Sequence, residues 1–168
     1  MGTEIERKFL ILLPDFDTIP EKRIQDMIQT YLTPPRNDPG AERRVRKISE
    51  NGIVRFIYTE KRPIPGMAKM VRQEEEWEIS ADEYRGKLTD AITELTKTRY
   101  SFPYAGHTIE IDVYPHEIGG DALDGLAVME IELSSPDEAI EFPPFIRVIR
   151  ELTGTREFSN KAMARPVK

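Results

Sequence analysis

Residues 3–13, TEIERKFLILL, alternate charged and apolar side chains with a period of two. This period predicts a β-strand that places Glu4, Glu6 and Lys8 together on one face and apolar side chains on the other. Residues two apart on one face of a strand lie about 7 Å apart, a spacing that suits the ligands of a common site. A solvated strand with cross-strand ion pairs would show the same pattern, so this segment alone leaves both interpretations open.

The chain has 168 residues, which is enough for one domain with a sizeable core, and we expect a single domain over residues 1–168. Its 24 basic and 30 acidic side chains give a net charge of −6, which disfavours binding of duplex nucleic acid through bulk electrostatics. There is no cysteine, which excludes disulfides and thiolate metal sites. No signal peptide and no apolar run of about 20 residues is present, so we expect a cytoplasmic protein that does not enter a membrane.

Turn signals divide the chain into eight expected strands and several helices. Asn51-Gly52 gives the clearest signal, because both residues tolerate the positive φ angles of a tight hairpin. The expected strands cover residues 3–13, 29–33, 42–49, 53–61, 70–79, 97–102, 107–114 and 126–134. Capping boxes and apolar residues spaced three and four apart predict helices that follow Thr18 and Ser80. Further helical segments are expected after Pro136, over residues 144–152, and as a last turn over residues 159–164.

The charged residues of most of these strands share one face. Glu110 with Asp112, and Glu130 with Glu132, repeat the paired carboxylates of the first strand and lie opposite apolar residues. The same spacing relates Arg72, Glu74, Glu76 and Glu78, then Lys97 and Arg99, and then Arg55, Thr59 and Lys61. Over residues 43–47 basic side chains occur on both faces, so the face that joins the other charges stays open.

Eight mostly antiparallel strands with charged faces in common predict a closed barrel turned inside out. The expected fold class is mainly antiparallel β with flanking helices (α+β), an eight-stranded tunnel with a charged lumen and helices over its apolar outer side. Unpaired buried ions are unfavourable, so this many inward charges require water, mutual pairing or a charged ligand. Clustered carboxylates without His or Cys suit Mg²⁺ or Mn²⁺, and clustered Lys and Arg suit phosphate. The sequence therefore predicts a site for a metal ion and a polyphosphate.

The charged blocks resemble those of the CYTH proteins, also called triphosphate tunnel metalloenzymes. The diagnostic ExExK block of that family is similar to Glu4, Glu6 and Lys8. The later blocks are similar, in order, to Arg44 and Arg46, Thr59 and Lys61, Arg72 with Glu74 and Glu76, Lys97 and Arg99, Glu110 and Asp112, Glu130 and Glu132, and residues 158–160. A single ExExK is a weak signal, whereas eight blocks in the family order are specific. Phe158 stands where the family usually has Tyr, a difference that removes the phenol hydroxyl.

The resemblance implies a role for each group of matching residues. The carboxylates are implied to hold one or two Mg²⁺ or Mn²⁺ ions, and they are Glu4, Glu6, Glu110, Asp112, Glu130 and Glu132. The cations are implied to bind the phosphate chain, and they are Lys8, Arg44, Arg46, Lys61, Arg72 and Arg99. Lys97 and Tyr31 are implied to form a catalytic pair near the scissile phosphate, where a lysine among cations could act as acid or base.

The resemblance also implies metal-dependent hydrolysis of a short linear triphosphate, with inorganic tripolyphosphate favoured. Thiamine triphosphatases, RNA triphosphatases and class IV adenylate cyclases belong to the same family, and the cyclases carry a His-Phe pair six residues ahead of the first Glu of ExExK. Only residues 1–3 precede Glu4, so we expect hydrolysis in preference to cyclisation of ATP. A non-catalytic polyphosphate- or nucleotide-binding module is the alternative from a different class. The expected partner is a small anionic triphosphate, and a homodimer stays open.

Overall fold

The computed structural model describes residues 2–167 and consists mainly of β-strands. The strands are β1 (Gly2–Leu12), β2 (Arg23–Leu32), β3 (Glu42–Glu50), β4 (Ile53–Pro63), β5 (Val71–Ile79), β6 (Ala91–Tyr104), β7 (His107–Val113), β8 (Leu126–Glu132), β9 (Val148–Glu151) and β10 (Arg165–Pro166). The helices are α1 (Ala81–Lys87), α2 (His116–Gly119) and α3 (Asn160–Met163), with 3-10 turns η1 (Phe16–Thr18), η2 (Leu88–Asp90) and η3 (Asp121–Leu123). Within the described range, no helix combines the length and the apolar character needed to cross a membrane.

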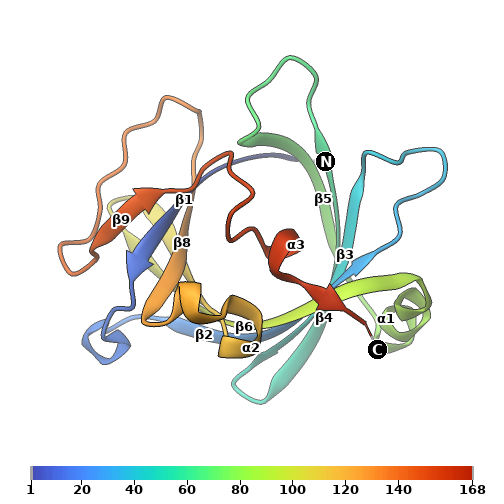
Figure 1. Ribbon diagram of the computed structural model, residues 1–168, viewed down its shortest axis with the longest axis horizontal. Helices are drawn as coiled ribbons and strands as arrows, with labels where there is room; N and C mark the ends of the chain where they lie inside the picture. Colours follow the sequence, from blue (N-terminus) through green and yellow to red (C-terminus); the bar gives the residue numbers. More distant parts are fainter. Residues whose placement is uncertain (1, 168) are drawn as a thin grey trace.

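Strands β1 to β8 form a closed antiparallel barrel (Figure 1). They follow one another around it in the order β6, β2, β3, β4, β5, β1, β8 and β7, and the pairing of β7 with β6 closes the ring. The predicted hairpin at Asn51-Gly52 joins β3 to β4, with φ angles of 51° and 79°. Strand β9 pairs with β1, and β10 pairs with β6. The predicted fold class, an eight-stranded antiparallel barrel with a few flanking helices, is confirmed.

An apolar core lies on the outer side of β1, β7 and β8. Phe9, Ile109 and Ile131 project from these strands into it and are almost completely buried. The loop between β8 and β9 covers part of this core, because its residues Ile140 and Ile146 pack against it. The prediction of an apolar side outside the barrel therefore holds, but loops rather than helices form this part of the cover.

One end of the barrel interior is also apolar. Leu10, Leu95 and Val128 continue the inward faces of β1, β6 and β8 and are buried in a single cluster. Side chains from α2, η3 and α3 pack onto them, namely Ile118, Leu123 and Met163. Figure 1 shows α3 within the outline of the strand ring, and α3 also contacts β6. Charged space is therefore confined to the remaining part of the interior.

Several predicted helices are wrong. Residues 23–32 form the single strand β2, so the helix predicted after Thr18 is wrong, whereas the strand predicted over residues 29–33 is present as the second part of β2. Residues 148–151 form β9, and the segment that follows Pro136 has no helix. The helix predicted from Ser80 ends at Lys87, and only the three residues of η2 separate it from β6. In β2 the period of two was hidden because apolar residues occur on both faces. Met27 lines the interior, whereas its neighbour Ile28 points the other way.

Candidate functional site

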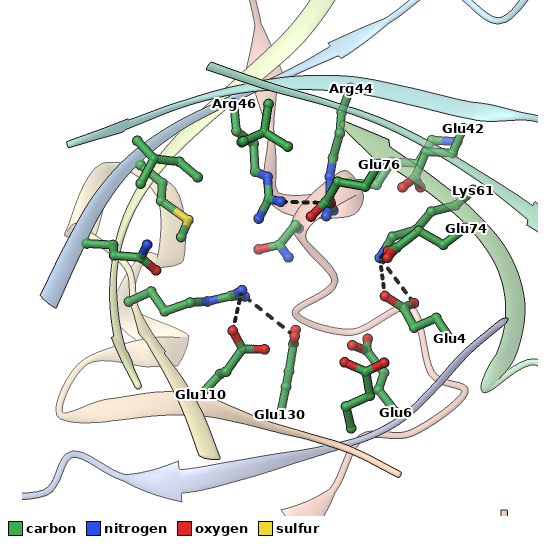
Figure 2. Close-up of a pocket in the computed structure, with 18 of the residues that line it drawn as sticks. Glu4, Glu6, Glu42, Arg44, Arg46, Lys61, Glu74, Glu76, Glu110 and Glu130 are labelled. Carbon is green, nitrogen blue, oxygen red and sulfur yellow. Dashed lines mark hydrogen bonds and ion pairs between the residues drawn. The ribbon is translucent and has the colours of Figure 1, made fainter. Parts of the chain in front are cut away.

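The charged part of the barrel interior is a cavity of about 340 Å³ (Figure 2). All eight barrel strands contribute side chains to its wall, as does the segment around α3. Eight glutamates and nine lysines or arginines are among the lining residues, so the wall is charged throughout and nearly neutral in sum. Such a wall can bind a highly charged ligand by exchanging internal ion pairs for contacts with that ligand.

Most of the predicted site residues meet in this cavity although they come from distant segments. Twelve of the fourteen line it, namely Glu4, Glu6, Lys8, Tyr31, Arg44, Arg46, Lys61, Arg72, Arg99, Glu110, Glu130 and Glu132. The other two, Lys97 and Asp112, are buried behind its wall. Most of the charged side chains that strand periodicity placed on a common face therefore meet in one cavity. Lys97 and Asp112 are on the inward faces of their strands too, but they are buried more deeply than the cavity wall.

The structure settles which face of β3 points inward. Arg44 and Arg46 line the cavity together with Glu42, and Arg43 and Lys47 lie on the outer face. Arg43 forms its ion pair outside the barrel with Asp90, at 3.3 Å between Nη2 and Oδ2. The closed register determines this choice, because Arg44 lies opposite Tyr31 and Thr59. Tyr31 lines the interior, as do Ile57 and Lys61, which lie two residues to either side of Thr59.

Carboxylates gather on the β1, β5 and β8 side of the cavity. Glu4 receives hydrogen bonds from Lys61 Nζ at 2.9 Å and from Arg72 Nη2 at 3.1 Å. Burial alone would raise the pKa of Glu4, but the two cations outweigh it and lower the pKa to about 2. Glu130 lies 3.4 Å from Lys8 Nζ, and the surrounding cations likewise hold its pKa below the usual range despite its burial. These two carboxylates are therefore charged and paired.

Glu6 lies in the same wall but lacks a partner of opposite charge. No residue in the range 2–167 forms an ion pair with it. Burial and the nearby carboxylates of Glu130 and Glu4 raise the pKa of Glu6 to about 7. Over the same described range, no three carboxylates or imidazoles are already gathered as a metal site. The wall thus contains an acidic group without an ion-pair partner, for which burial and repulsion outweigh the attraction of Lys61 and Lys8.

Two arginines dominate the opposite side of the cavity. Figure 2 shows Arg44 and Arg46 side by side, with Glu6, Glu110 and Glu130 entering from the other side. Arg46 donates a hydrogen bond from Nη2 to Glu76 at 2.9 Å (Figure 2). Burial and the adjacent Arg44 lower the pKa of Arg46 to about 10. The buried Nε of each of these arginines has no hydrogen-bond partner among the described residues, which leaves donors for the oxygens of an anion.

Lys97 and Asp112 form an ion pair beneath the wall. Both side chains are only 1% exposed, and Lys97 Nζ donates to Asp112 Oδ2 at 2.7 Å. Asp112 also accepts from Arg99 Nε at 2.7 Å, and Arg99 reaches Glu110 at 3.0 Å and Glu130 at 3.5 Å. Burial lowers the pKa of Lys97 to about 8. The pair therefore holds Arg99 in a fixed orientation at the edge of the cavity.

The two residues of the predicted catalytic pair form hydrogen bonds with other partners and none with each other. Across the β2–β6 ladder, Tyr31 lies opposite Thr93 and Lys97 lies opposite Met27. Tyr31 and Met27 are four residues apart on one strand, which corresponds to about 13 Å. The Tyr31 hydroxyl accepts a hydrogen bond from Gln29 Nε2 at 2.7 Å. The acid–base roles of Tyr31 and Lys97 stay predictions.

The cavity includes residues that were not predicted as site residues, among them Arg23, Glu42 and Lys161. The period-two test could have found Glu42 once the inward face of β3 was known. Arg23 was missed because the part of β2 ahead of residue 29 was interpreted as a helix. Lys161 reaches the wall through α3, which the Ser159 hydroxyl caps and Met163 anchors in the apolar end of the barrel. No local pattern indicates that this short helix enters the barrel.

A closed antiparallel barrel whose interior is lined by interspersed carboxylates, lysines and arginines defines a class of barrel proteins with an enclosed, charged cavity. The model of the CYTH domain family matches residues 2–166 of this chain. The chain therefore belongs to the CYTH family, and the predicted resemblance is confirmed.

Two individual proteins match this chain over nearly its whole length. The inorganic triphosphatase of Nitrosomonas europaea is 31% identical, and the match covers 96% of this chain and 97% of that protein. The inorganic triphosphatase of Acetivibrio thermocellus is 27% identical, with 98% and 95% covered. Among solved structures, the PH1819 protein of Pyrococcus horikoshii OT3 has a TM-score of 0.58 at 24% identity, with 80% of each chain covered. This structural likeness supports the fold alone.

Proposed function

We propose that the protein hydrolyses a short linear triphosphate in the presence of Mg²⁺ or Mn²⁺, with inorganic tripolyphosphate as the favoured substrate. The observation that carries this proposal is the divided cavity, in which Arg44 and Arg46 face a wall of carboxylates around Glu6. The two relatives named inorganic triphosphatase support the reaction class, because each matches nearly the full chain.

The phosphate chain is assigned to cavity cations, because each can donate charge-assisted hydrogen bonds to phosphate oxygens. These cations are Lys8, Arg44, Arg46, Lys61, Arg72 and Arg99. Arg44 and Arg46 have buried Nε donors without protein partners, so an oxyanion can bind them without breaking a hydrogen bond at these atoms. Lys61 and Arg72 form ion pairs with Glu4, and in the complex a phosphate would replace Glu4 as their partner, so both cations would stay paired.

The carboxylate wall fits a hard divalent cation, because its donors are oxygens. Burial, together with repulsion from Glu130 and Glu4, raises the pKa of Glu6, and a bound cation would relieve the repulsive part. Glu4, Glu6, Glu130 and Glu132 would hold Mg²⁺ or Mn²⁺, which when bound would stabilise the negative charge that develops on the phosphates. Two further acids, Glu110 and Asp112, pair with Arg99, and family resemblance is the only support for their role as metal ligands.

Hydrolysis forms a bond between a water oxygen and the terminal phosphorus and breaks the bridging P–O bond. The electron pair of the broken bond stays on pyrophosphate, and the water proton passes to a phosphate oxygen or to solvent. Positioning and charge stabilisation supply most of the catalysis in this chemistry. Two observations support the predicted acid–base pair: Tyr31 lines the cavity, and the pKa of Lys97 is lowered to about 8 by burial.

A substrate panel tests the proposal. Purified protein is incubated with tripolyphosphate, ATP, thiamine triphosphate or pyrophosphate, each with Mg²⁺, Mn²⁺ or EDTA, and both orthophosphate and cyclic AMP are measured. We expect metal-dependent orthophosphate release that is fastest from tripolyphosphate. Cyclic AMP as the main product would replace hydrolysis with cyclisation. Tight substrate binding without turnover under every metal would identify a binding module instead.

Two variants separate metal binding from phosphate binding. Glu6→Ala should abolish metal-dependent turnover, because it removes the unpaired carboxylate of the acidic wall. Lys8→Ala should chiefly raise KM, because Lys8 is assigned to the phosphates. Normal activity in the first variant would exclude the metal assignment, and an unchanged KM in the second would exclude the phosphate assignment.

A further inference from the structure

A second cavity, which we call the side pocket, adjoins the main one. It has a volume of about 250 Å³ and shares Glu6, Lys8, Arg72 and Ser159 with the main cavity. Its outer wall comes from the chain between β4 and β5 and from the chain after β9. Lys69 of the first segment and Arg156 of the second are exposed, so the side pocket opens toward solvent. The side pocket therefore lies between the acidic wall and solvent.

The side pocket carries an excess of positive charge, unlike the nearly neutral main cavity. Lys8 and Arg72 lie on the shared wall, and Lys69 and Arg156 lie on the loops. Glu6 is the single carboxylate among the residues that line it. Neither Lys69 nor Arg156 forms an ion pair with any other residue between positions 2 and 167. Four cations around one carboxylate favour a small anion.

The loop after β9 is attached directly to the phosphate-binding wall. Leu152 N donates to the carbonyl oxygen of Lys8 at 2.7 Å, and Lys8 N donates to Thr153 Oγ1 at 2.9 Å. Gly154 follows with a φ of +77°, a conformation that favours glycine and turns the chain toward Arg156. Because Lys8 lines both cavities, these hydrogen bonds place the loop cations at a set position beside the main cavity.

We propose that the side pocket is an orthophosphate site that receives the terminal phosphate after its cleavage and through which this product leaves. This inference rests on the proposed function. A phosphate held by Lys8 and Arg72 already borders the side pocket, so it can pass to Lys69 and Arg156 without crossing the rest of the cavity. The remaining pyrophosphate would still be held by the arginines of β3, which lie outside the side pocket.

Direct binding of inorganic orthophosphate tests the site without depending on catalysis. The full chain is dialysed to equilibrium against radiolabelled orthophosphate in metal-free buffer, as wild type, as the double variant Lys69→Ala/Arg156→Ala, and as the control Arg36→Ala. Arg36 is also an exposed loop arginine, and it lines neither cavity. We expect the double variant to bind orthophosphate about tenfold more weakly, with the control unchanged, because two solvent-exposed charged contacts are lost. Equal affinity in all three proteins would overturn the proposal.

Product inhibition then tests the route during turnover. Orthophosphate should inhibit tripolyphosphate hydrolysis in a pattern that is not competitive, and its inhibition constant should rise about tenfold in the double variant. Purely competitive inhibition with the same constant in both proteins would place orthophosphate in the main cavity and overturn the route. Absence of hydrolysis by the wild type would refute the proposed function, and the dialysis result would still decide whether the side pocket binds orthophosphate.

Discussion

Replacement of Glu6 with Gln should stabilise the folded protein at alkaline pH when no divalent cation is present. Burial, together with Glu130 and Glu4, raises the pKa of Glu6 from 4.5 to about 7. Folding therefore favours the protonated carboxyl, and between these pH values the native state binds more protons than the unfolded chain. As a consequence, the contribution of Glu6 to stability falls as the pH rises from 4.5 to about 7.

The size of this effect follows from the pKa difference. A change from 4.5 to about 7, at about 1.36 kcal/mol per pH unit, corresponds to about 3 kcal/mol of destabilisation once the pH exceeds both values. Gln resembles the protonated carboxyl in shape and carries no charge, so the variant avoids this unfavourable term. We therefore expect Glu6→Gln to raise the free energy of unfolding by up to about 3 kcal/mol at pH 8, with little difference near pH 4.5.

Urea unfolding followed by circular dichroism at pH 5 and pH 8 in EDTA measures this difference. The exposed substitution Glu21→Gln serves as the control and should change stability little at either pH. Addition of Mg²⁺ at pH 8 should stabilise the wild type more than Glu6→Gln, because the variant lacks one ligand of the proposed metal site. A variant at pH 8 that is no more stable than the wild type in EDTA would refute the reasoning about Glu6.

Three further substitutions test other parts of the interior. Asp112→Asn removes the countercharge of two buried cations and should lower the free energy of unfolding by about 3–5 kcal/mol in urea; a loss below about 1 kcal/mol would contradict this role. Arg46→Ala should raise KM for tripolyphosphate about tenfold or more in steady-state assays, whereas Arg43→Ala, on the outer face of the same strand, should leave KM unchanged. Tyr31→Phe should lower kcat about 100-fold if its hydroxyl transfers a proton, and an unchanged kcat would exclude Tyr31 from the chemistry.

Much of the barrel could be predicted from the sequence because a strand has a strict period of two. In β1 this period places Glu4, Glu6 and Lys8 on the same face, and the structure places all three in the cavity. The hairpin at Asn51-Gly52 was predictable because the conformation of a two-residue turn depends on those residues themselves. Where one face is charged and the other apolar, local chemistry specifies the strand and the direction of its side chains.

The same test failed where the two faces are not chemically distinct. In β2, Met27 faces the cavity and Ile28 faces outward, so apolar residues occur three and four apart and imitate a helix. Strand β9 was mistaken for a helix for a related reason, since its four residues are all exposed and its pairing partner is β1, far away in the sequence. Both strands form because of pairing with distant segments, which local periodicity does not report.

The sequence alone determined which residue types belong to the interior and which strand faces carry most of them. Only the tertiary structure decided the depth of each residue, because the register and closure of the barrel set how far each position lies along its axis. Closure selected Arg44 over Arg43 and placed Lys97 and Asp112 behind the wall rather than in the cavity. The apolar end of the barrel, the entry of α3 and the side pocket likewise depend on contacts between segments that are distant in the chain.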